Sequence, residues 1–391
     1  FEPHPPRSMG LFKRKKGKKE ETKEDEEFAM PDLTPVETIE PPRHGELPDV
    51  DFFLATADPT MESLTINPTL MKPLFNIPTR ILALRDSLTE LHIVNQPLVQ
   101  AFDEHLVELH RLRVLHLEHM PVGELPLAFN KLAPTLEHLQ LTRCDLQHFP
   151  LPVCDLRRCR FLNLDDNQID EVPEEIGQME ALEFLHVSKN IISSVPEGMG
   201  ALRSLRVFHA FKNKLKSLPD SLGRLERLEE LVVSDNKIRT FPPELCTQSL
   251  RYIGFADNSM RRLPPAIGQC RRLQVLDVQG NGIEELPESI GDLQELRVLR
   301  LSSNFITVVP PCVHQLRKLR ELTYRGNTLA DLPYGLAGRS RAVRQAHGGS
   351  LRRRSVGGVR SSGGGGGGGR WAPAWPLLSR ESAWVVDEDK L

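Results

Sequence analysis

Residues 286–306 read LPESIGDLQELRVLRLSSNFI, and the same order of apolar, proline, glycine and asparagine positions returns along most of the chain. The centre of the pattern is Leu-x-x-Leu-x-Leu-x-x-Asn-x-Leu, which recurs every 22 to 24 residues until it ends near Pro333. Its first apolar position falls at eleven places: Leu88, Leu112, Leu136, Cys159, Leu182, Leu205, Leu228, Leu250, Leu273, Leu296 and Leu319. The repeat therefore decides the fold before any single residue is considered.

A repeat of this period and spacing is typical of leucine-rich-repeat proteins. Within one unit, Leu299 and Leu301 alternate with Val298, Arg300 and Ser302, as the two faces of a short strand do. Each unit has one apolar face and needs a neighbour to bury it. We therefore predict an α/β repeat solenoid, a leucine-rich-repeat horseshoe of about eleven units with a parallel β-sheet on its concave face.

An asparagine stands at the same place in each of the last eight units. Its amide can donate to and accept from the backbone groups left unpaired where each strand turns away, which predicts a structural role. The first three units carry Gln96, Met120 and Cys144 there, and a thioether cannot donate, so we expect a looser amino-terminal third. The predicted structural ladder is Asn167, Asn190, Asn213, Asn236, Asn258, Asn281, Asn304 and Asn327.

The second half of each unit reads apolar-Pro-x-x-apolar-Gly, most clearly at 172–177, 218–223 and 286–291. With this half included, the units resemble those of the intracellular Ras-group leucine-rich-repeat proteins, which include Ras-pathway scaffolds and the Scribble and Erbin type. The resemblance covers the repeats and rests on positions that build the core. It implies a scaffold whose concave face holds a folded partner, often a small GTPase of the Ras group or a phosphatase complex.

The composition favours an interaction protein inside the cell. The 391 residues have a formal net charge of −3, and no apolar run approaches the ~18 residues that span a bilayer. Most of the six cysteines take small apolar positions of the repeat, and neither flank holds a clustered pair. Because disulfides are rare in reducing compartments, this pattern predicts a cytoplasmic location.

The flanks differ from the repeats. Residues 1–48 hold a basic block, then an acidic run, then prolines, and lack the apolar surface needed to fold. Residues 49–87 are richer in apolar groups and are predicted to cap the first open strand of a solenoid spanning 88–338. Residues 339–391 are rich in Arg, Ser and Gly and are read as a disordered tail. Within it, Arg352-Arg353-Arg354-Ser355 resembles a basophilic kinase site, which makes Ser355 a candidate phosphosite.

The basic block, Lys13 to Lys19, is a candidate for weak contact with the inner face of an anionic membrane. A solvated charged tail is the favoured alternative, because the acidic run beside it offsets part of that attraction. The chain begins with Phe1, so Met9 is considered as another start. Met9-Gly10 is a poor myristoylation signal because Arg14 stands where Ser or Thr is required.

No catalytic motif was found. The chain lacks a phosphate-binding loop, a dinucleotide fingerprint, a His-Glu-x-x-His pair and a Gly-x-Ser-x-Gly elbow. We therefore expect no enzyme activity, no cofactor, no small-molecule substrate and no metal site. Nucleic-acid binding is disfavoured because the chain is slightly acidic and no basic stripe follows the repeats.

The concave face is the predicted binding surface, and two columns of strand residues form it. Read together with Phe211, they give three regions along the sheet. The first, the aromatic patch, comprises Phe161, Phe184, His186, Val207, His209, Phe211 and Tyr252. The second, the acidic stretch, comprises Glu229, Glu230, Asp235, Asp257 and Asp277, and the third, the basic end, comprises Arg297, Arg300, Arg320 and Arg325.

Aromatic residues flanked by charge have the composition of interface hot spots with a polar rim. The other interpretation is that apolar residues at these strand positions are repeat filler. The sequence predicts a non-enzymatic scaffold in intracellular signalling that binds a folded protein, with a Ras-type GTPase implied only by the resemblance. The alternative is the targeting or regulatory fragment of a larger leucine-rich-repeat kinase, phosphatase or cyclase.

Overall fold

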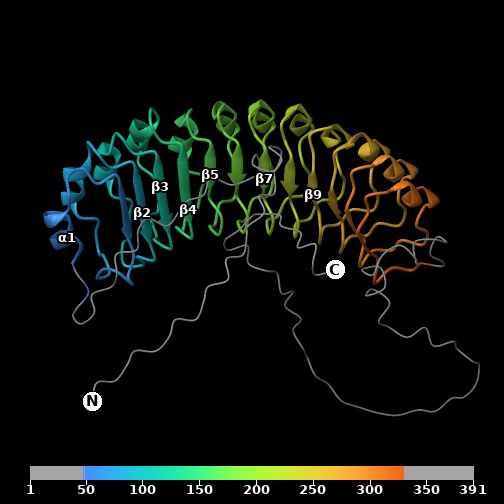
Figure 1. Cartoon of the computed structure of the whole chain (residues 1–391), viewed down its shortest axis with the longest axis horizontal. Helices are drawn as coiled ribbons and strands as arrows, with labels where there is room; N and C mark the ends of the chain where they lie inside the picture. The colour runs from blue at the N-terminus through green and yellow to red at the C-terminus, as the bar shows by residue number, and fades with distance from the viewer. Residues whose placement is uncertain (1–46, 48, 330–391) are drawn as a thin grey trace, which may run out of the picture. The chain divides into compact units, whose positions relative to one another are not determined.

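A computed structural model describes residue 47 and residues 49–329, which form one curved stack of repeats (Figure 1). A single parallel sheet runs the length of the stack, with strands in the order of the sequence. Its members are β1 (Ser63–Ile66), β2 (Glu90–Val94), β3 (Val114–Glu118), β4 (His138–Thr142), β5 (Phe161–Asn163), β6 (Phe184–His186), β7 (Val207–His209), β8 (Glu230–Val232), β9 (Tyr252–Gly254), β10 (Val275–Asp277), β11 (Val298–Arg300) and β12 (Glu321–Thr323).

The predicted repeat fold is confirmed, and the sheet has twelve strands where eleven were expected. The eleven predicted strands are β2 to β12. The additional strand, β1, pairs in parallel with β2 and buries Leu64 and Ile66. It follows α1 (Val50–Thr56), whose first turn is capped by the Asp49 carboxylate accepting from the Asp51 N–H. The segment expected to cover the first strand thus extends the sheet itself.

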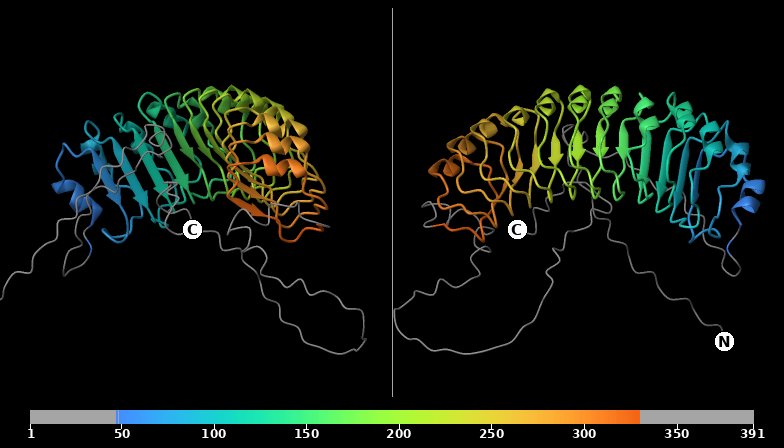
Figure 2. Two further views of the ribbon diagram at one scale, coloured as in Figure 1. Left: turned by 45° about the vertical axis from the view of Figure 1, so that its right-hand side comes forward. Right: turned by 180° about the vertical axis from the view of Figure 1, so that it is seen from behind.

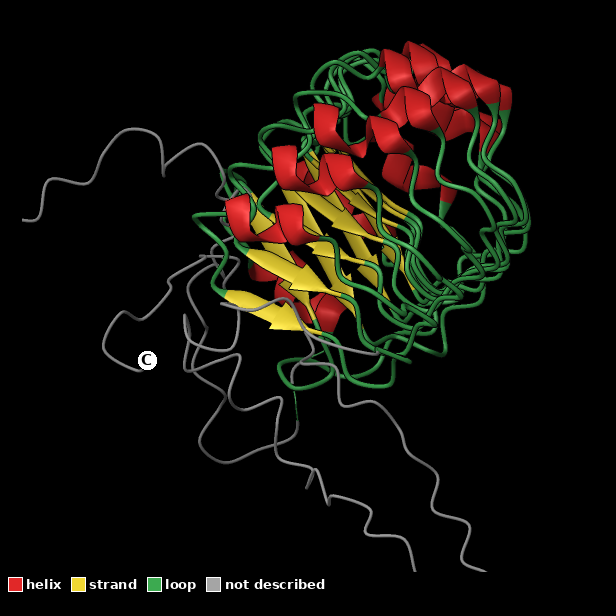
Figure 3. Ribbon diagram, turned by 90° about the vertical axis from the view of Figure 1, so that its right-hand side faces the viewer, coloured by secondary structure: helices red, strands yellow, loops and turns green. Residues whose placement is uncertain are grey.

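A row of 3-10 helices lies on the outer side of the stack, opposite the sheet (Figures 2 and 3). Proline is the residue before ten of these eleven helices, where its fixed φ directs the chain into the first turn. They are η2 (Thr79–Leu84), η3 (Glu104–Glu108), η4 (Leu127–Leu132), η5 (Leu151–Asp155), η6 (Glu174–Gln178), η7 (Glu197–Ala201), η8 (Asp220–Arg224), η9 (Pro243–Leu245), η10 (Pro265–Gln269), η11 (Glu288–Asp292) and η12 (Pro311–Gln315).

The glycine of the second half-unit is required by close packing between neighbouring helices of this row. A Cβ atom on Gly200 would lie 2.6 Å from the carbonyl oxygen of Ser221, and one on Gly223 would lie 2.6 Å from that of Glu244. No real side chain tolerates such a contact with backbone. The helix row can therefore follow the sheet closely only because these positions lack a side chain.

The turn that follows each strand has the same backbone in every unit from β2 onward. The residue before the ladder position has a positive φ, from 52° at His119 to 74° at Gly326. All eight ladder asparagines then make the same contacts. Asn190, for example, donates through Nδ2 to the Leu164 carbonyl at 3.0 Å and accepts through Oδ1 from the Ile169 N–H at 3.0 Å. The amides thus tie each turn to the preceding unit.

The first three repeat units have no asparagine at the ladder position. Their strands β2, β3 and β4 have five residues each, whereas β5 to β12 have three. At the ladder position, the Gln96 N–H donates to the His119 carbonyl at 3.1 Å, and the Gln96 side chain accepts from the Leu74 N–H at 2.8 Å. The Gln96 side chain therefore takes over the acceptor contact of the ladder, while its buried Nε2 has no hydrogen-bond partner among the described residues. The looser amino-terminal third stays a prediction.

Candidate functional site on the concave face

The strand register places the predicted residues in two columns that run along the sheet. One column passes through Phe161, Phe184 and Val207, and the other through Asn163, His186 and His209. Because neighbouring strands lie about 4.8 Å apart, side chains of successive units in one column contact each other. The columns that the repeat predicts are therefore present over the whole described sheet.

The rings of the aromatic patch form a continuous run from Phe161 to His209, whereas Glu230 stands between Val207 and Tyr252 in the strand register. The ring centroids of Phe161 and Phe184 are 6.1 Å apart, those of Phe161 and His186 are 5.4 Å apart, and those of His186 and His209 are 4.5 Å apart. His138, which the sequence did not single out, stacks on Phe161 at 5.9 Å. The patch therefore begins one strand earlier than predicted.

Three of the seven patch residues are less accessible than the sequence suggested. Phe161 is 6% exposed, Val207 7% and His186 8%. The rings of Phe161 and His186 are covered by rings of neighbouring units. The members that remain half-buried, and so reach the surface, are Phe184, His209, Phe211 and Tyr252.

The two central histidines have different surroundings. His209 lies with Nε2 2.9 Å from a Glu230 carboxylate oxygen. His186 lies beneath its neighbours, and its Nε2 is buried and has no hydrogen-bond partner among residues 49–329. Burial first, and then the nearby His209, hold the pKa of His186 well below its ordinary value. His186 is thus a neutral, polar group at the centre of the patch.

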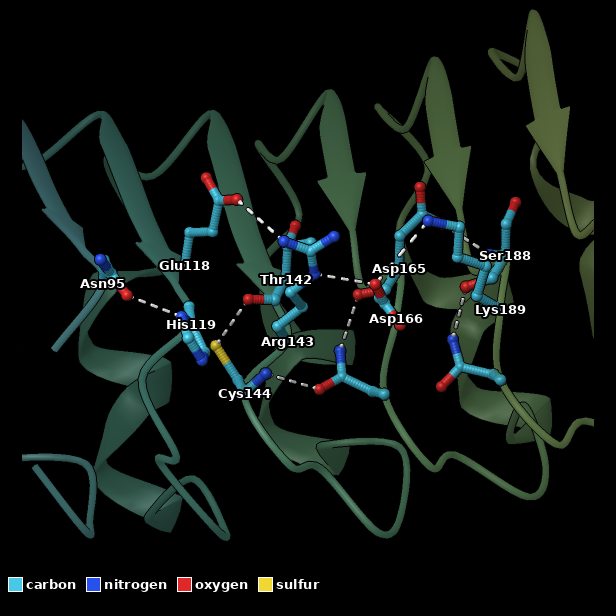
Figure 4. Close-up of polar contacts among 12 residues, drawn as sticks. Asn95, Glu118, His119, Thr142, Arg143, Cys144, Asp165, Asp166, Ser188 and Lys189 are labelled. Atoms are coloured by element: carbon cyan, nitrogen blue, oxygen red, sulfur yellow. Dashed lines mark hydrogen bonds and ion pairs between the residues drawn. The ribbon is translucent and has the colours of Figure 1, made fainter. Parts of the chain in front are cut away.

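One charged residue of this centre was missed by the sequence analysis. Asp165 follows β5 and accepts a short hydrogen bond from the Ser188 N–H, as Figure 4 shows. Burial raises the pKa of Asp165 to about 6, although the Ser188 contact acts in the opposite direction. Asp165 stands two positions after Asn163, so the alternation of the strand residues, extended by one step, would have placed Asp165 on the same face.

Figure 4 also shows a chain of polar contacts along the edge where the strands end. Arg143 lies 4.0 Å from a Glu118 carboxylate oxygen and 2.8 Å from one of Asp166, and Lys189 lies 3.7 Å from the same Asp166 oxygen. These contacts join four successive units. This edge is therefore close to neutral beside the aromatic patch.

The acidic stretch is largely neutralised by partners that the columns alone did not show. Glu229 lies 3.1 Å from Arg206 and 3.4 Å from Arg251, while Asp277 lies 3.3 Å from Arg300. Asp235 and Asp257 remain exposed. Burial and the neighbouring Asp235 raise the pKa of Asp257, as expected where carboxylates gather.

The basic end contains one arginine held between two carboxylates and three exposed arginines. Arg300 lies between two carboxylates, with its Nε 2.9 Å from Glu321 and its Nη1 3.3 Å from Asp277. Arg297, Arg320 and Arg325 are exposed. Burial raises the pKa of Tyr252 to about 12, so this phenol is neutral near the boundary between the aromatic patch and the basic end.

A third column, which the sequence analysis missed, precedes the strands; we call it the start column. In it, each N–H donates to the carbonyl of the preceding member at 2.7 to 2.9 Å. From unit two to unit eight its charge alternates, and ion pairs join Arg113 to Glu137, Arg160 to Glu183, and Glu229 to both Arg206 and Arg251. Its members are Thr89, Arg113, Glu137, Arg160, Glu183, Arg206, Glu229, Arg251, Gln274, Arg297 and Arg320.

A second histidine pair lies at the other end of the concave face. His92 and His116 are paired by the register of β2 and β3, and their Nδ1 atoms are 3.4 Å apart. Burial, followed by the proximity of His92, lowers the pKa of His116 to about 4. Both rings are therefore neutral near pH 7.

Residues 49–329 contain no group of three or more His, Cys, Asp or Glu side chains arranged to hold a metal ion. They also contain no helix with the length and apolar character that crossing a membrane requires. The candidate phosphosite Ser355 and the basic block Lys13 to Lys19 lie outside the described residues.

Comparison with known proteins agrees with this geometry. The family described as "Leucine-rich repeat region" matches residues 152–249 and 244–333. The search of curated proteins returned no match.

Three solved structures illustrate the likeness. The plant peptide hormone receptor RGFR1, in complex with RGF2, is 21% identical with a TM-score of 0.59, over 70% of this chain and 44% of its own. An internalin, InlF, from Listeria monocytogenes is 19% identical with a TM-score of 0.57, over 66% and 73%. PEPR1, in a structure with AtPEP1, is 25% identical with a TM-score of 0.55, over 68% and 41%.

The chain thus spans less than half the length of the RGFR1 and PEPR1 chains. The likeness to RGFR1 and to the internalin is one of fold, and it agrees with the period of the sequence and the single parallel sheet. This chain therefore has the fold of a leucine-rich-repeat solenoid, and its residues 152–249 and 244–333 match that family's model.

Proposed function

We propose that the chain is a non-enzymatic scaffold that binds a protein partner on its concave face, across units four to eleven. The observation that carries the proposal is the aromatic patch, whose rings form a continuous run from Phe161 to His209. Phe184, Phe211 and Tyr252 reach the surface in the middle of a sheet whose flanks are charged and mostly ion-paired. An apolar centre inside a polar rim is the arrangement of an interface hot spot.

The comparisons support protein or peptide binding as the general activity. The RGFR1 and PEPR1 structures each contain a second component, RGF2 and AtPEP1 respectively. For this chain, the finer proposal is a folded partner, and a Ras-type small GTPase or its signalling complex is the class that the resemblance of the repeats implies. Charge on the rim would set the orientation and the rate of association.

The proposed location is the cytoplasm. All six cysteines are free, and five are buried. Burial raises the pKa of Cys144, Cys154 and Cys159 to about 12, so these thiols act as small apolar core groups. Unpaired core cysteines are the usual state in a reducing compartment. Contact of Lys13 to Lys19 with the inner face of a membrane is part of this proposal.

The test is affinity capture from a cell lysate with the full chain, in the presence of a non-hydrolysable GTP analogue or of GDP. Partners are quantified by mass spectrometry for the wild type and for the double variant Phe184→Asp/Phe211→Asp. The control variant is Phe305→Asp, because Phe305 is exposed outside the concave columns. The proposal predicts a partner lost only in the double variant, and a GTPase partner is retained only with the GTP analogue. A partner held equally by all three proteins would move the binding site off the patch.

A further inference from the structure

The segments that lead from the ladder asparagines to the outer helices carry exposed cations in units six to eight. In each segment an apolar residue is buried in the core, as Leu215 and Ile238 are, and its neighbours face solvent. The segments lie side by side, because the Lys237 N–H donates to the Leu215 carbonyl at 2.8 Å and the Ser259 N–H donates to the Ile238 carbonyl at 2.9 Å. The cations form what we call the basic patch, which comprises Lys214, Lys216, Lys237, Arg239, Arg261 and Arg262.

The basic patch is confined to three units. The repeat position that holds Lys216 holds Asp170 in unit four and Glu284 in unit nine. The Glu284 N–H donates to the Arg261 carbonyl at 3.2 Å, so the sign of the charge changes between two adjacent segments. The patch is therefore a local feature of this side of the stack.

The six cations have no partner inside the described part of the chain. None of them makes an ion pair or a side-chain hydrogen bond with residue 47 or with residues 49–329. Arg143 and Lys189, by contrast, both lie beside Asp166 at the strand ends. Like charges on neighbouring segments repel each other, and carboxylates or phosphates laid across them would replace this repulsion by charge-assisted hydrogen bonds.

We propose that the basic patch is a docking site for a short acidic segment of a protein partner. Charge complementarity defines the chemistry of that segment, which presents several carboxylates or phosphates to the six cations. None of the six residues belongs to the concave columns. The proposal therefore stands apart from the aromatic patch and adds a second binding surface to the chain.

The dimensions of the patch favour a short segment over a long polyanion. Adjacent segments are about 4.8 Å apart, so three units offer roughly 10 Å, which three or four extended residues cross. A nucleic acid or a flat anionic membrane would continue into unit nine, where Glu284 and Glu285 are exposed. These carboxylates would repel either surface.

The test measures the fluorescence anisotropy of fluorescein-labelled peptides with the full chain, at low and at physiological ionic strength. The first peptide is a run of glutamates between glycine-serine ends, the second has glutamine at every glutamate, and the third has phosphoserine in place of two glutamates. The decisive variant is Lys216→Glu/Arg239→Glu, in the middle of the patch. Its matched control is Arg203→Glu/Arg227→Glu, which makes the same charge change at two exposed positions on the turns that lead into β7 and β8.

We expect the wild type to bind the glutamate peptide, and added salt to weaken the binding. The phosphoserine peptide should bind at least as tightly, because a phosphate carries more charge than a carboxylate. Lys216→Glu/Arg239→Glu should reduce affinity roughly tenfold or more, whereas Arg203→Glu/Arg227→Glu should change it by no more than about twofold. The thermal midpoint of the patch variant should match that of the wild type, because neither replaced side chain has a partner among the described residues.

Zero-length crosslinking locates the bound peptide on the full chain, which also has basic residues at 13–19 and 352–354. A carbodiimide joins carboxylates to the lysine amines that they contact, and mass spectrometry identifies the joined residues. We expect the glutamate peptide on Lys214, Lys216 or Lys237. Peptide joined only to lysines within 13–19 would contradict the proposal, as would residues 20–27 of the chain joined to the patch in its place.

The proposal is overturned if the glutamate peptide does not bind, if the glutamine peptide binds equally, or if both double variants lose affinity to the same extent. A labelled oligonucleotide or phosphatidylserine vesicles that bind the patch more tightly than every peptide would also overturn it. None of the peptides has an apolar anchor, so failure here leaves the proposal for the aromatic patch standing. Failure of the Phe184→Asp/Phe211→Asp test leaves the proposal for the basic patch standing.

Discussion

At the scale of the single residue, the ladder asparagines carry more of the fold than their small side chains suggest. Replacing Asn190 by Ala removes the donor to the carbonyls of Leu164 and Val187 and the acceptor of the Ile169 N–H, all of which are buried. We expect a loss of about 2 to 4 kcal/mol in the free energy of unfolding, measured by urea denaturation. Asn130→Ala is the matched control, because Asn130 is exposed on η4; an equal loss in both would contradict the ladder role.

For Asp165, we expect a substitution to stabilise the protein. Burial raises the pKa of Asp165 in the folded protein to about 6. Above that pH the buried, ionised carboxylate lowers the free energy of unfolding. This loss disappears as the pH falls toward the pKa of an exposed aspartate, because the folded protein then binds the proton. Asp165→Asn keeps an acceptor for the Ser188 N–H without the charge. The variant should be more stable than wild type by about 1 to 3 kcal/mol near neutral pH and equally stable at about pH 4. A difference that does not change with pH would contradict this account.

At the scale of the element, the start column behaves as one unit. Arg206→Glu would place three carboxylates side by side, at positions 183, 206 and 229, where wild type has a half-buried ion pair. We expect a loss of about 1 to 2 kcal/mol in the free energy of unfolding, reduced by added salt. Arg203→Glu, an exposed change outside the column, should cost much less, and equal costs would argue against a structural role for the alternation.

The histidine pair on β2 and β3 is expected to make this end of the sheet less stable in acid. Burial lowers the pKa of His116 in the folded protein to about 4, below the pKa of an exposed histidine. The unfolded chain therefore binds a proton more readily than the folded protein, and stability falls as the pH drops below the pKa of an exposed histidine toward about 4. Between about pH 6.5 and 5 the wild type should lose about 1 to 2 kcal/mol more than His116→Gln in urea unfolding. Parallel pH profiles of the two proteins would rule out the imidazole as the cause.

At the scale of the whole molecule, the periodic part of the structure was predictable and the exceptions were not. The strand positions and both concave columns follow from the period, because every unit repeats one backbone. The strand β1 was missed because residues 63–66 lie in a degenerate unit whose spacing departs from the pattern. The start column was overlooked because its alternation becomes visible only when one position is compared between units.

The candidate site was predictable in composition but not in accessibility. Phe161 and His186 were expected at the surface, and the rings of neighbouring units bury them. Ion pairs between successive units neutralise much of the acidic stretch, as at Glu229. Such pairs depend on side-chain rotamers, which the sequence does not specify. The surface offered to a partner is therefore smaller, and its acidic part more nearly neutral, than the sequence indicated.

The central claim is that a protein partner is held on the concave face, and photo-crosslinking tests it most directly. The full chain would carry benzoylphenylalanine at position 184, or at position 201 on the outer helix η7 as the control, and be irradiated in a cell lysate. The account predicts a discrete crosslinked protein from position 184, absent from position 201 and lost on adding excess wild type. The same crosslinked protein from position 201 alone, or from both positions equally, would contradict binding on the concave face.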